Sequence, residues 1–145
     1  MSKKNLSKRA WGNLRIGITG ASGSFGRALT KKFKEKGAII IGLTHREIQE
    51  KNKTIDTPHE WVIWECGKES ALNEVLKTLD ILIINHGINP KGKIGHEDLT
   101  KVLEVNALSA WRLIKEFERV SKESNQQSGY KELWVNTSEA EVQPA

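Results

Sequence analysis

The segment GITGASGSFG, residues 17–26, places Gly20, Gly23 and Gly26 at three-residue intervals between an apolar run and a helical pattern. At the start of a helix, unpaired N–H groups and the positive end of the helix dipole meet. Glycine lets a phosphate approach this point, because no side chain blocks it, and glycine also permits a tight turn. The segment therefore predicts a phosphate-binding turn: Gly20 leaves the strand, Gly23 admits a diphosphate and Gly26 packs against the strand.

Short β-rich runs alternate with helical patterns along the rest of the chain, which is typical of βαβ units. Strands are expected at 14–19, 38–43, 61–65, 81–85 and 132–136, and helices at 24–36, 71–79 and 97–121. Right-handed crossovers then predict an α/β fold, a Rossmann-like doubly wound parallel sheet of order 3-2-1-4-5. Ligands of such sheets bind at the carboxyl ends of the strands, so five separate segments are expected to meet at one crevice.

Composition limits the class of protein. A chain of 145 residues with 37% hydrophobic and 28% charged residues is expected to form one globular domain. No apolar run approaches the ~18 residues of a membrane span, and no secretory signal is evident, so a cytoplasmic location is expected. The single cysteine, Cys66, agrees with a reducing compartment.

The net charge of +5 is concentrated at the beginning of the chain. Residues 1–13 are expected to form a basic, flexible tail, and residues 14–145 a dinucleotide-binding domain. Because the body without the tail is nearly neutral, a nucleic-acid partner is not expected.

Four segments together resemble the cofactor-binding half of the short-chain dehydrogenase/reductase family, in that family's order and spacing. They are TGASGSFG at 19–26, ILIINHG at 81–87, EVNALSAW at 104–111 and LWVNTSE at 133–139. The glycine spacing is similar to that of the family's extended branch. Within the family, NHGIN and VNTSEAE look most like the reductase part of cyanobacterial proteins that fuse a sterol-desaturase-like membrane region to such a domain. The resemblance implies hydride transfer between a nicotinamide cofactor and a small-molecule carbonyl or alcohol substrate.

The expected cofactor-binding residues come from four segments of the crevice. They are Gly20, Ser22, Gly23, Ser24, Phe25 and Gly26; Thr44, His45 and Arg46; Glu65 and Cys66; and Asn85, His86 and Gly87. The hydroxyls of Ser22 and Ser24 can add hydrogen bonds, and Ser24 can cap the helix. The resemblance implies that Glu65 contacts the adenine amino group and that the Cys66 backbone lies beside the ring.

His86 stands where the family usually has a smaller alanine. The histidines of the chain show no metal-ligand spacing, so no metal site is expected and a structural role is favoured for His86.

The residues after the second strand bear on the choice of cofactor. A site that prefers NAD normally has an acidic residue there, which binds both ribose hydroxyls. This chain has Arg46, which can pair with a 2′-phosphate through two N–H groups, and Thr44 and His45 can assist. We therefore favour NADP(H) over NAD(H). Glu47 leaves the alternative open, because a shift of one residue in register would direct an acid at the ribose.

The resemblance also implies catalytic positions. Asn106 matches an asparagine that bonds backbone near the fourth strand and helps to hold a water linked to the catalytic lysine; for this chain we favour its structural role. Ser138 is favoured for the catalytic serine, with Glu139 as the alternative under another alignment. The family's Tyr-x-x-x-Lys pair is not found, so the chain is expected to be C-terminally incomplete relative to the family and inactive alone.

Two further expectations follow. A non-catalytic dinucleotide-binding or regulatory module stays open as the alternative to a reductase. The long helix that begins near Glu97 belongs to a surface that pairs subunits in similar proteins, so a homo-oligomer is possible.

Overall fold

The computed structural model describes residues 10–48, 53–124 and 131–137. Five strands in this part form one parallel sheet in the order β3-β2-β1-β4-β5. The strands are β1 (Arg15–Thr19), β2 (Ile39–Thr44), β3 (Glu60–Ile63), β4 (Ile81–Ile84) and β5 (Glu132–Val135). The predicted fold class and strand order are therefore confirmed.

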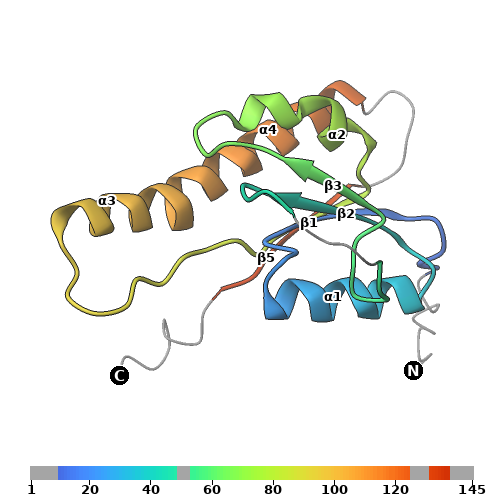
Figure 1. Ribbon diagram of the computed structural model, residues 1–145. Helices are drawn as coiled ribbons and strands as arrows, with labels where there is room; N and C mark the ends of the chain where they lie inside the picture. Colours follow the sequence, from blue (N-terminus) through green and yellow to red (C-terminus); the bar gives the residue numbers. More distant parts are fainter. Residues whose placement is uncertain (1–9, 49–52, 125–130, 138–145) are drawn as a thin grey trace, which may run out of the picture.

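Helices cover both faces of the sheet (Figure 1). One face carries α1 (Ser24–Glu35), and the other carries α4 (Ser109–Ser124) together with α2 (Asn73–Thr78) and the short 3-10 helix η1 (Glu69–Leu72). The helix α3 (His96–Leu103) extends beyond the sheet and continues into α4 through one π-helical turn, η2 (Glu104–Leu108). The single helix predicted for this region is therefore interrupted by a π turn.

The sheet buries apolar side chains on both faces, because neighbouring residues of a strand point in opposite directions. On β2, Ile40 belongs to the core beneath α1, whereas Ile41 belongs to the core beneath α2 and α4. Phe33 of α1 completes the first core and Phe117 of α4 completes the second. Each interior strand is thus fixed in register, since a slip of one residue would exchange the two faces.

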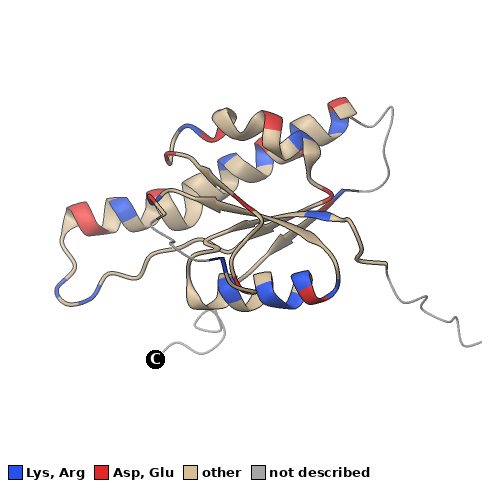
Figure 2. Cartoon of the chain, turned by 45° about the vertical axis from the view of Figure 1, so that its right-hand side comes forward, with Lys and Arg blue, Asp and Glu red and all other residues tan. Residues whose placement is uncertain are grey.

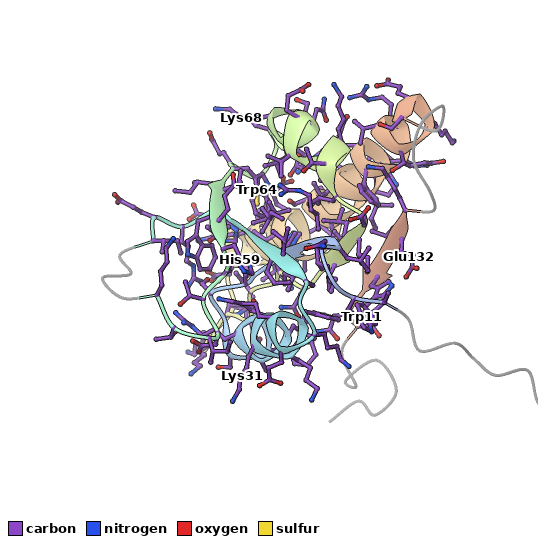
Figure 3. The ribbon with its side chains drawn as sticks, turned by 90° about the vertical axis from the view of Figure 1, so that its right-hand side faces the viewer. Trp11, Lys31, His59, Trp64, Lys68 and Glu132 are labelled. Carbon is purple, nitrogen blue, oxygen red and sulfur yellow. The ribbon has the colours of Figure 1, made fainter. Side chains whose placement is uncertain are left out.

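The packed domain begins earlier than predicted. The ring centroid of Trp11 lies 5.2 Å from that of Phe33 and 6.1 Å from that of Trp134, between α1 and β5 (Figure 3). The Asn13 amide donates a hydrogen bond of 3.0 Å to the Gly37 carbonyl. Trp11 and Asn13, which the prediction placed in the tail, therefore contact the domain. The basic residues 1–9 lie outside the described part of the chain.

Charged side chains lie mainly on the helices, and basic positions recur along α1 (Figure 2). On α4, Arg119 pairs with Glu116 at 2.9 Å and with Glu123 at 2.7 Å. Among the described residues, no helix has both the length and the apolar character that a membrane crossing requires. The helices α1 and α4 are thus amphipathic elements with one face on the sheet.

Candidate functional site

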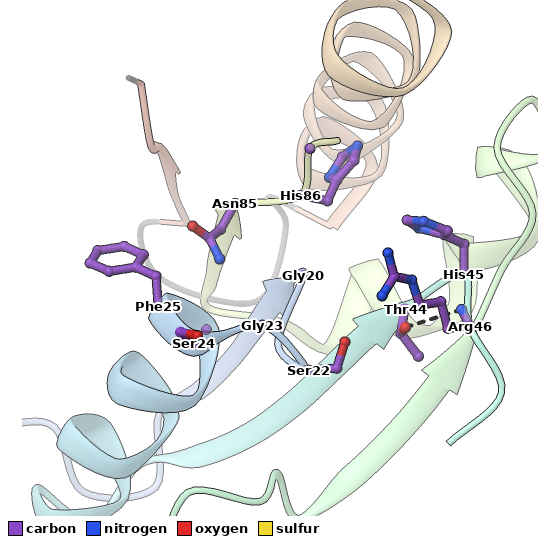
Figure 4. A pocket seen from close by; sticks show the side chains of 12 residues that line it. Gly20, Ser22, Gly23, Ser24, Phe25, Thr44, His45, Arg46, Asn85 and His86 are labelled. Carbon is purple, nitrogen blue, oxygen red and sulfur yellow. Dashed lines mark hydrogen bonds between the residues drawn. The ribbon is translucent and has the colours of Figure 1, made fainter. Parts of the chain in front are cut away.

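A cavity of about 240 Å³ opens at the carboxyl ends of β1, β2 and β4, beside the start of α1 (Figure 4). Its lining is Gly20, Ser22, Gly23, Ser24, Phe25, Gly26, Thr44, His45, Arg46, Asn85, His86 and Gly87. All of these are residues that the sequence predicts for cofactor contact. The remaining two predicted residues, Glu65 and Cys66, line an adjoining cavity of about 640 Å³, and His45 and Arg46 belong to both cavities.

The turn between β1 and α1 depends on two glycines with no room for a side chain. Gly20 has a φ of +64°, and a Cβ atom there would lie 2.9 Å from the Asn85 carbonyl oxygen. A Cβ atom on Gly26 would lie 2.3 Å from the Gly20 carbonyl oxygen and 2.6 Å from the Ala21 Cα. Gly26 therefore packs on the turn at the end of β1, so that the first turn of α1 lies directly against the strand end.

The start of α1 is open to an anion. The residue that precedes the helix is Gly23, which supplies no side-chain cap, so the predicted capping role of Ser24 is wrong. The first N–H groups of a helix have no partner within the helix, and here no acidic residue occupies the first turn. These donors and the helix dipole fit the diphosphate of a dinucleotide, which needs close backbone approach and positive potential.

The hydroxyl of Thr19 joins β1 to the end of β4. Thr19 is fully buried, and its Oγ1 accepts hydrogen bonds from the amides of Asn85, at 2.7 Å, and His86, at 3.1 Å. The same oxygen lies 2.9 Å from the His86 Nδ1 and 3.4 Å from the Ile83 carbonyl. Since both amides donate to the oxygen, the hydroxyl proton is left to donate to the Ile83 carbonyl or to the His86 Nδ1. One buried side chain thus fixes the cavity wall that β4 provides.

Replacing Thr19 with valine is expected to lower the free energy of unfolding by about 2–4 kcal/mol, because two amide donors lose their buried acceptor. Urea denaturation followed by circular dichroism measures this difference. Thr19→Ser is the matched control: it keeps the hydroxyl and should cost about 1 kcal/mol. Equal losses in the two variants would contradict the role given to the hydroxyl.

His86 forms an aromatic group with Trp64 and His45. The ring centroid of Trp64 lies 5.6 Å from that of His86 and 5.8 Å from that of His45, and the rings meet edge-on in both cases. Burial lowers the pKa of His86 to about 4, and the nearby His45 adds to the effect. His86 is therefore neutral at pH 7, with its Nδ1 used by Thr19. Among the described residues no hydrogen-bond partner is found for its Nε2, so the predicted structural histidine is only half satisfied.

Asn106 lies in the π turn and holds the loop after β4. Its Oδ1 accepts from the Ile88 amide at 2.7 Å, and its Nδ2 donates to the Ile88 carbonyl at 2.9 Å. Asn136, at the end of β5, donates from Nδ2 to the Asn85 Oδ1 at 2.8 Å. The side chain of Asn106 thus makes the backbone bonds near β4 that its favoured structural role requires. Ser138 and Glu139 lie outside the described residues.

The other predicted groups are arranged as follows. The carboxylate of Glu65 pairs with Lys68 at 2.6 Å, and Cys66 is a partly buried free thiol. Phe25 is about half exposed at the mouth of the first cavity. Within the described residues, no group of three or more histidine, cysteine or acidic side chains is arranged to hold a metal ion.

Comparisons with known proteins place this site in a family. Residues 16–139 match the model of the NAD dependent epimerase/dehydratase family. The chain belongs to this family. A monoglucosyldiacylglycerol epimerase of Synechocystis is 38% identical over 133 residues, which cover 90% of this chain and 32% of the relative. An uncharacterised oxidoreductase of Bacillus subtilis, YvaG, is 28% identical over 69% of this chain and 43% of the relative. The chain thus spans less than half the length of these relatives.

Solved structures support the fold of this epimerase/dehydratase-family chain. A short-chain dehydrogenase from Leptospira borgpetersenii with bound NAD⁺ matches with a TM-score of 0.75 and 22% identity, over 97% of this chain and 58% of that one. An NAD⁺-bound xylitol dehydrogenase matches with a TM-score of 0.76 and 21% identity, over 94% and 57%. These structures confirm the fold that the short-chain dehydrogenase resemblance implies, and the family shown is the NAD dependent epimerase/dehydratase family. The sterol-desaturase part is corrected, because the curated relative with 38% identity is an epimerase.

Several residues of the site of this family member are not predicted from the sequence. Thr19 lies inside the glycine segment at 17–26, but the spacing of the glycines does not predict a role for its hydroxyl. Ile88, Lys101 and Val105 line the larger cavity. A usable signal was the spacing of Lys101 and Val105, because residues four apart share one face of a helix.

Proposed function

We propose that this chain is the NADP(H)-binding part of an enzyme that transfers hydride to and from an alcohol or carbonyl carbon of a small molecule. One observation carries the proposal: a glycine-walled cavity lies between the carboxyl ends of the central strands and the open start of α1. Family membership adds the dinucleotide as the ligand class. A nicotinamide cofactor supplies the hydride chemistry when it is bound.

The chain's own residues have the task of binding and orienting. The first-turn amides of α1 bind the diphosphate, and Gly20 and Gly26 keep the backbone close enough for this contact. Thr19 fixes the opposite wall through Asn85 and His86. These contacts within the chain are already formed without the ligand, which reduces the ordering entropy that binding must cost.

The preference for NADP(H) rests on Arg46. Its amide donates to the Thr44 Oγ1 at 3.1 Å, and this short turn holds the residue at the mouth of the cavity (Figure 4). Its guanidinium can bind a 2′-phosphate through two parallel N–H groups. Glu47, the acidic alternative of the sequence, does not line the first cavity or the adjoining one.

The substrate class is proposed from the relative with 38% identity, which is a monoglucosyldiacylglycerol epimerase. Epimerisation at a hydroxyl-bearing carbon of a sugar first removes a hydride from the carbon and the proton from its hydroxyl, which leaves a carbonyl group. Both are then returned, with the hydride added to the opposite face of that carbon. No net oxidation results, so the cofactor ends in its starting state. We propose a sugar hydroxyl, in a glycolipid or a related glycoside, as the reacting group of the complete enzyme.

The test is titration with NADPH and NADH, followed by quenching of the tryptophan fluorescence, since Trp64 lines the larger cavity. We expect NADPH to bind about tenfold more tightly, and Arg46→Ala to remove most of this preference with less than about twofold effect on NADH. Lys31→Ala, an exposed cation on α1, is the matched control and should change neither affinity (Figure 3). Tighter binding of NADH, or an unchanged NADPH affinity in Arg46→Ala, would overturn the NADP(H) assignment.

A further inference from the structure

We propose that Lys101, on α3, is a second cation for the 2′-phosphate and acts together with Arg46. The inference rests on the proposed NADP(H) function and extends it to an element 55 residues further along the chain. It assigns to α3 a part in cofactor selection.

Arg46 and Lys101 face the same space. Both line the 640 Å³ cavity, and both also line a neighbouring cavity of about 370 Å³. Arg46 belongs in addition to the glycine-walled cavity at the start of α1. The carboxyl end of β2 and the helix α3 thus provide the two cations around one continuous region, which begins where the diphosphate is expected.

The acidic residues that line these two cavities are already engaged. Glu65 pairs with Lys68 at 2.6 Å, and Glu104 pairs with Arg112. Asp98 accepts a hydrogen bond of 3.0 Å from the Gly95 amide at the start of α3. The charges of Glu65 and Glu104 are thus offset by cations other than Arg46 and Lys101, whereas Asp98 is held by the backbone at the start of α3.

Arg46 and Lys101 are left without such partners. Within residues 10–48, 53–124 and 131–137, no carboxylate lies within ion-pair distance of either side chain. A phosphate monoester carries a charge of about −1.5 to −2 at pH 7, which two uncompensated cations balance.

His45 shows that the charges of Arg46 and Lys101 converge. Burial lowers the pKa of His45, and the charges of Arg46 and then Lys101 lower it further. The charged form of His45 is thus disfavoured, which makes His45 a poorer source of positive charge than a lysine. Lys101 is therefore the side chain that can supply the second charge beside Arg46.

The two cations suit different parts of the task. Arg46 offers a planar fork that fixes the orientation of the phosphate, whereas Lys101 offers a point charge on a long, flexible stem. Loss of Lys101 should therefore weaken attraction to the phosphate without disturbing the binding of adenosine.

The experiment compares adenosine 2′,5′-bisphosphate with adenosine 5′-monophosphate by calorimetric titration of the full chain. We expect Lys101→Ala to weaken the bisphosphate about 3- to 10-fold and the monophosphate less than about twofold. Lys101→Arg should retain the affinity for the bisphosphate, and Lys101→Glu should lower this affinity further than Lys101→Ala does. Lys91→Ala, an exposed cation that lines neither shared cavity, is the matched control.

The outcomes separate this inference from the proposed function. If wild type prefers the bisphosphate and Arg46→Ala loses the preference, but Lys101→Ala keeps it, the inference on Lys101 fails alone. Equal weakening of both nucleotides by Lys101→Ala would also overturn it, because the lysine would then act on the shared adenosine 5′-phosphate. If wild type shows no preference for the bisphosphate, the NADP(H) assignment itself fails.

Discussion

Replacing Glu69 with alanine is expected to lower the free energy of unfolding by about 3–5 kcal/mol, the largest effect of any single change proposed for this chain. Only 2% of its side chain is exposed. Its oxygens accept hydrogen bonds from the Ser109 hydroxyl at 2.7 Å, the Arg112 Nε at 2.8 Å and the Gly67 amide at 3.0 Å. Removal of the carboxylate leaves these donors without their acceptor and detaches η1 from α4.

Urea denaturation at pH 7 measures this loss, with Glu74→Ala as the matched control. Glu74 also pairs with a lysine, Lys77, at 2.6 Å, but its side chain is 86% exposed. The control should therefore cost less than about 1 kcal/mol. A similar small loss for both variants would show that the buried carboxylate does not join the two helices.

The Glu69 contribution also has a defined pH dependence. Burial raises the pKa of Glu69, but hydrogen bonds from Arg112, Gly67 and Ser109 outweigh burial and hold the pKa below its ordinary value. The folded state thus favours the charged form, and this stabilisation is complete above the ordinary pKa of about 4.3. It is lost as the pH falls through the lower, folded value. The difference between wild type and Glu69→Gln should accordingly shrink in acid.

Gly26→Ala is expected to lower the free energy of unfolding by about 3 kcal/mol and to weaken dinucleotide binding more than about tenfold. The new Cβ would lie 2.3 Å from the Gly20 carbonyl oxygen and 2.6 Å from the Ala21 Cα. Both neighbours are backbone atoms, so α1 must move away from the end of β1. This movement displaces the first-turn amides from the position that the diphosphate needs.

Gly12→Ala provides the control, because a Cβ atom there meets nothing within 4 Å. Thermal unfolding and NADPH titration should both give wild-type values for this variant. Unchanged stability and affinity in Gly26→Ala would mean that α1 does not need to lie against the turn, and the description of the cavity would then be wrong.

The sequence was sufficient to predict the sheet, because local and global signals agree there. The apolar runs that contain Ile40, Ile41 and Leu82 need burial on both faces, and only a covered parallel sheet provides it. The glycine spacing likewise predicted the cavity, because the glycines act within a single short turn of the chain. All residues predicted for the first strand-to-helix turn line the cavity.

The features that could not be predicted from the sequence depend on contacts between residues that are far apart in the chain. Glu69 accepts hydrogen bonds from Ser109 and Arg112, which lie 40 and 43 residues further along the chain. No local sequence pattern predicts such pairs. The π turn is similar: Asn106 is bonded to Ile88, 18 residues before it, and the apolar spacing of the helix does not reveal the extra residue. Lys101 was overlooked because a lysine on an amphipathic helix is usually a solvated residue.

An NMR titration of the ¹⁵N-labelled chain with NADPH tests most directly whether the turn between β1 and α1 binds the diphosphate. We expect the largest amide shifts on residues 20–26 at the start of α1, with further shifts at Arg46 and at 85–87. Saturable binding without shifts at residues 20–26, or the largest shifts on the far side of the sheet, would contradict the claim that this turn binds the diphosphate.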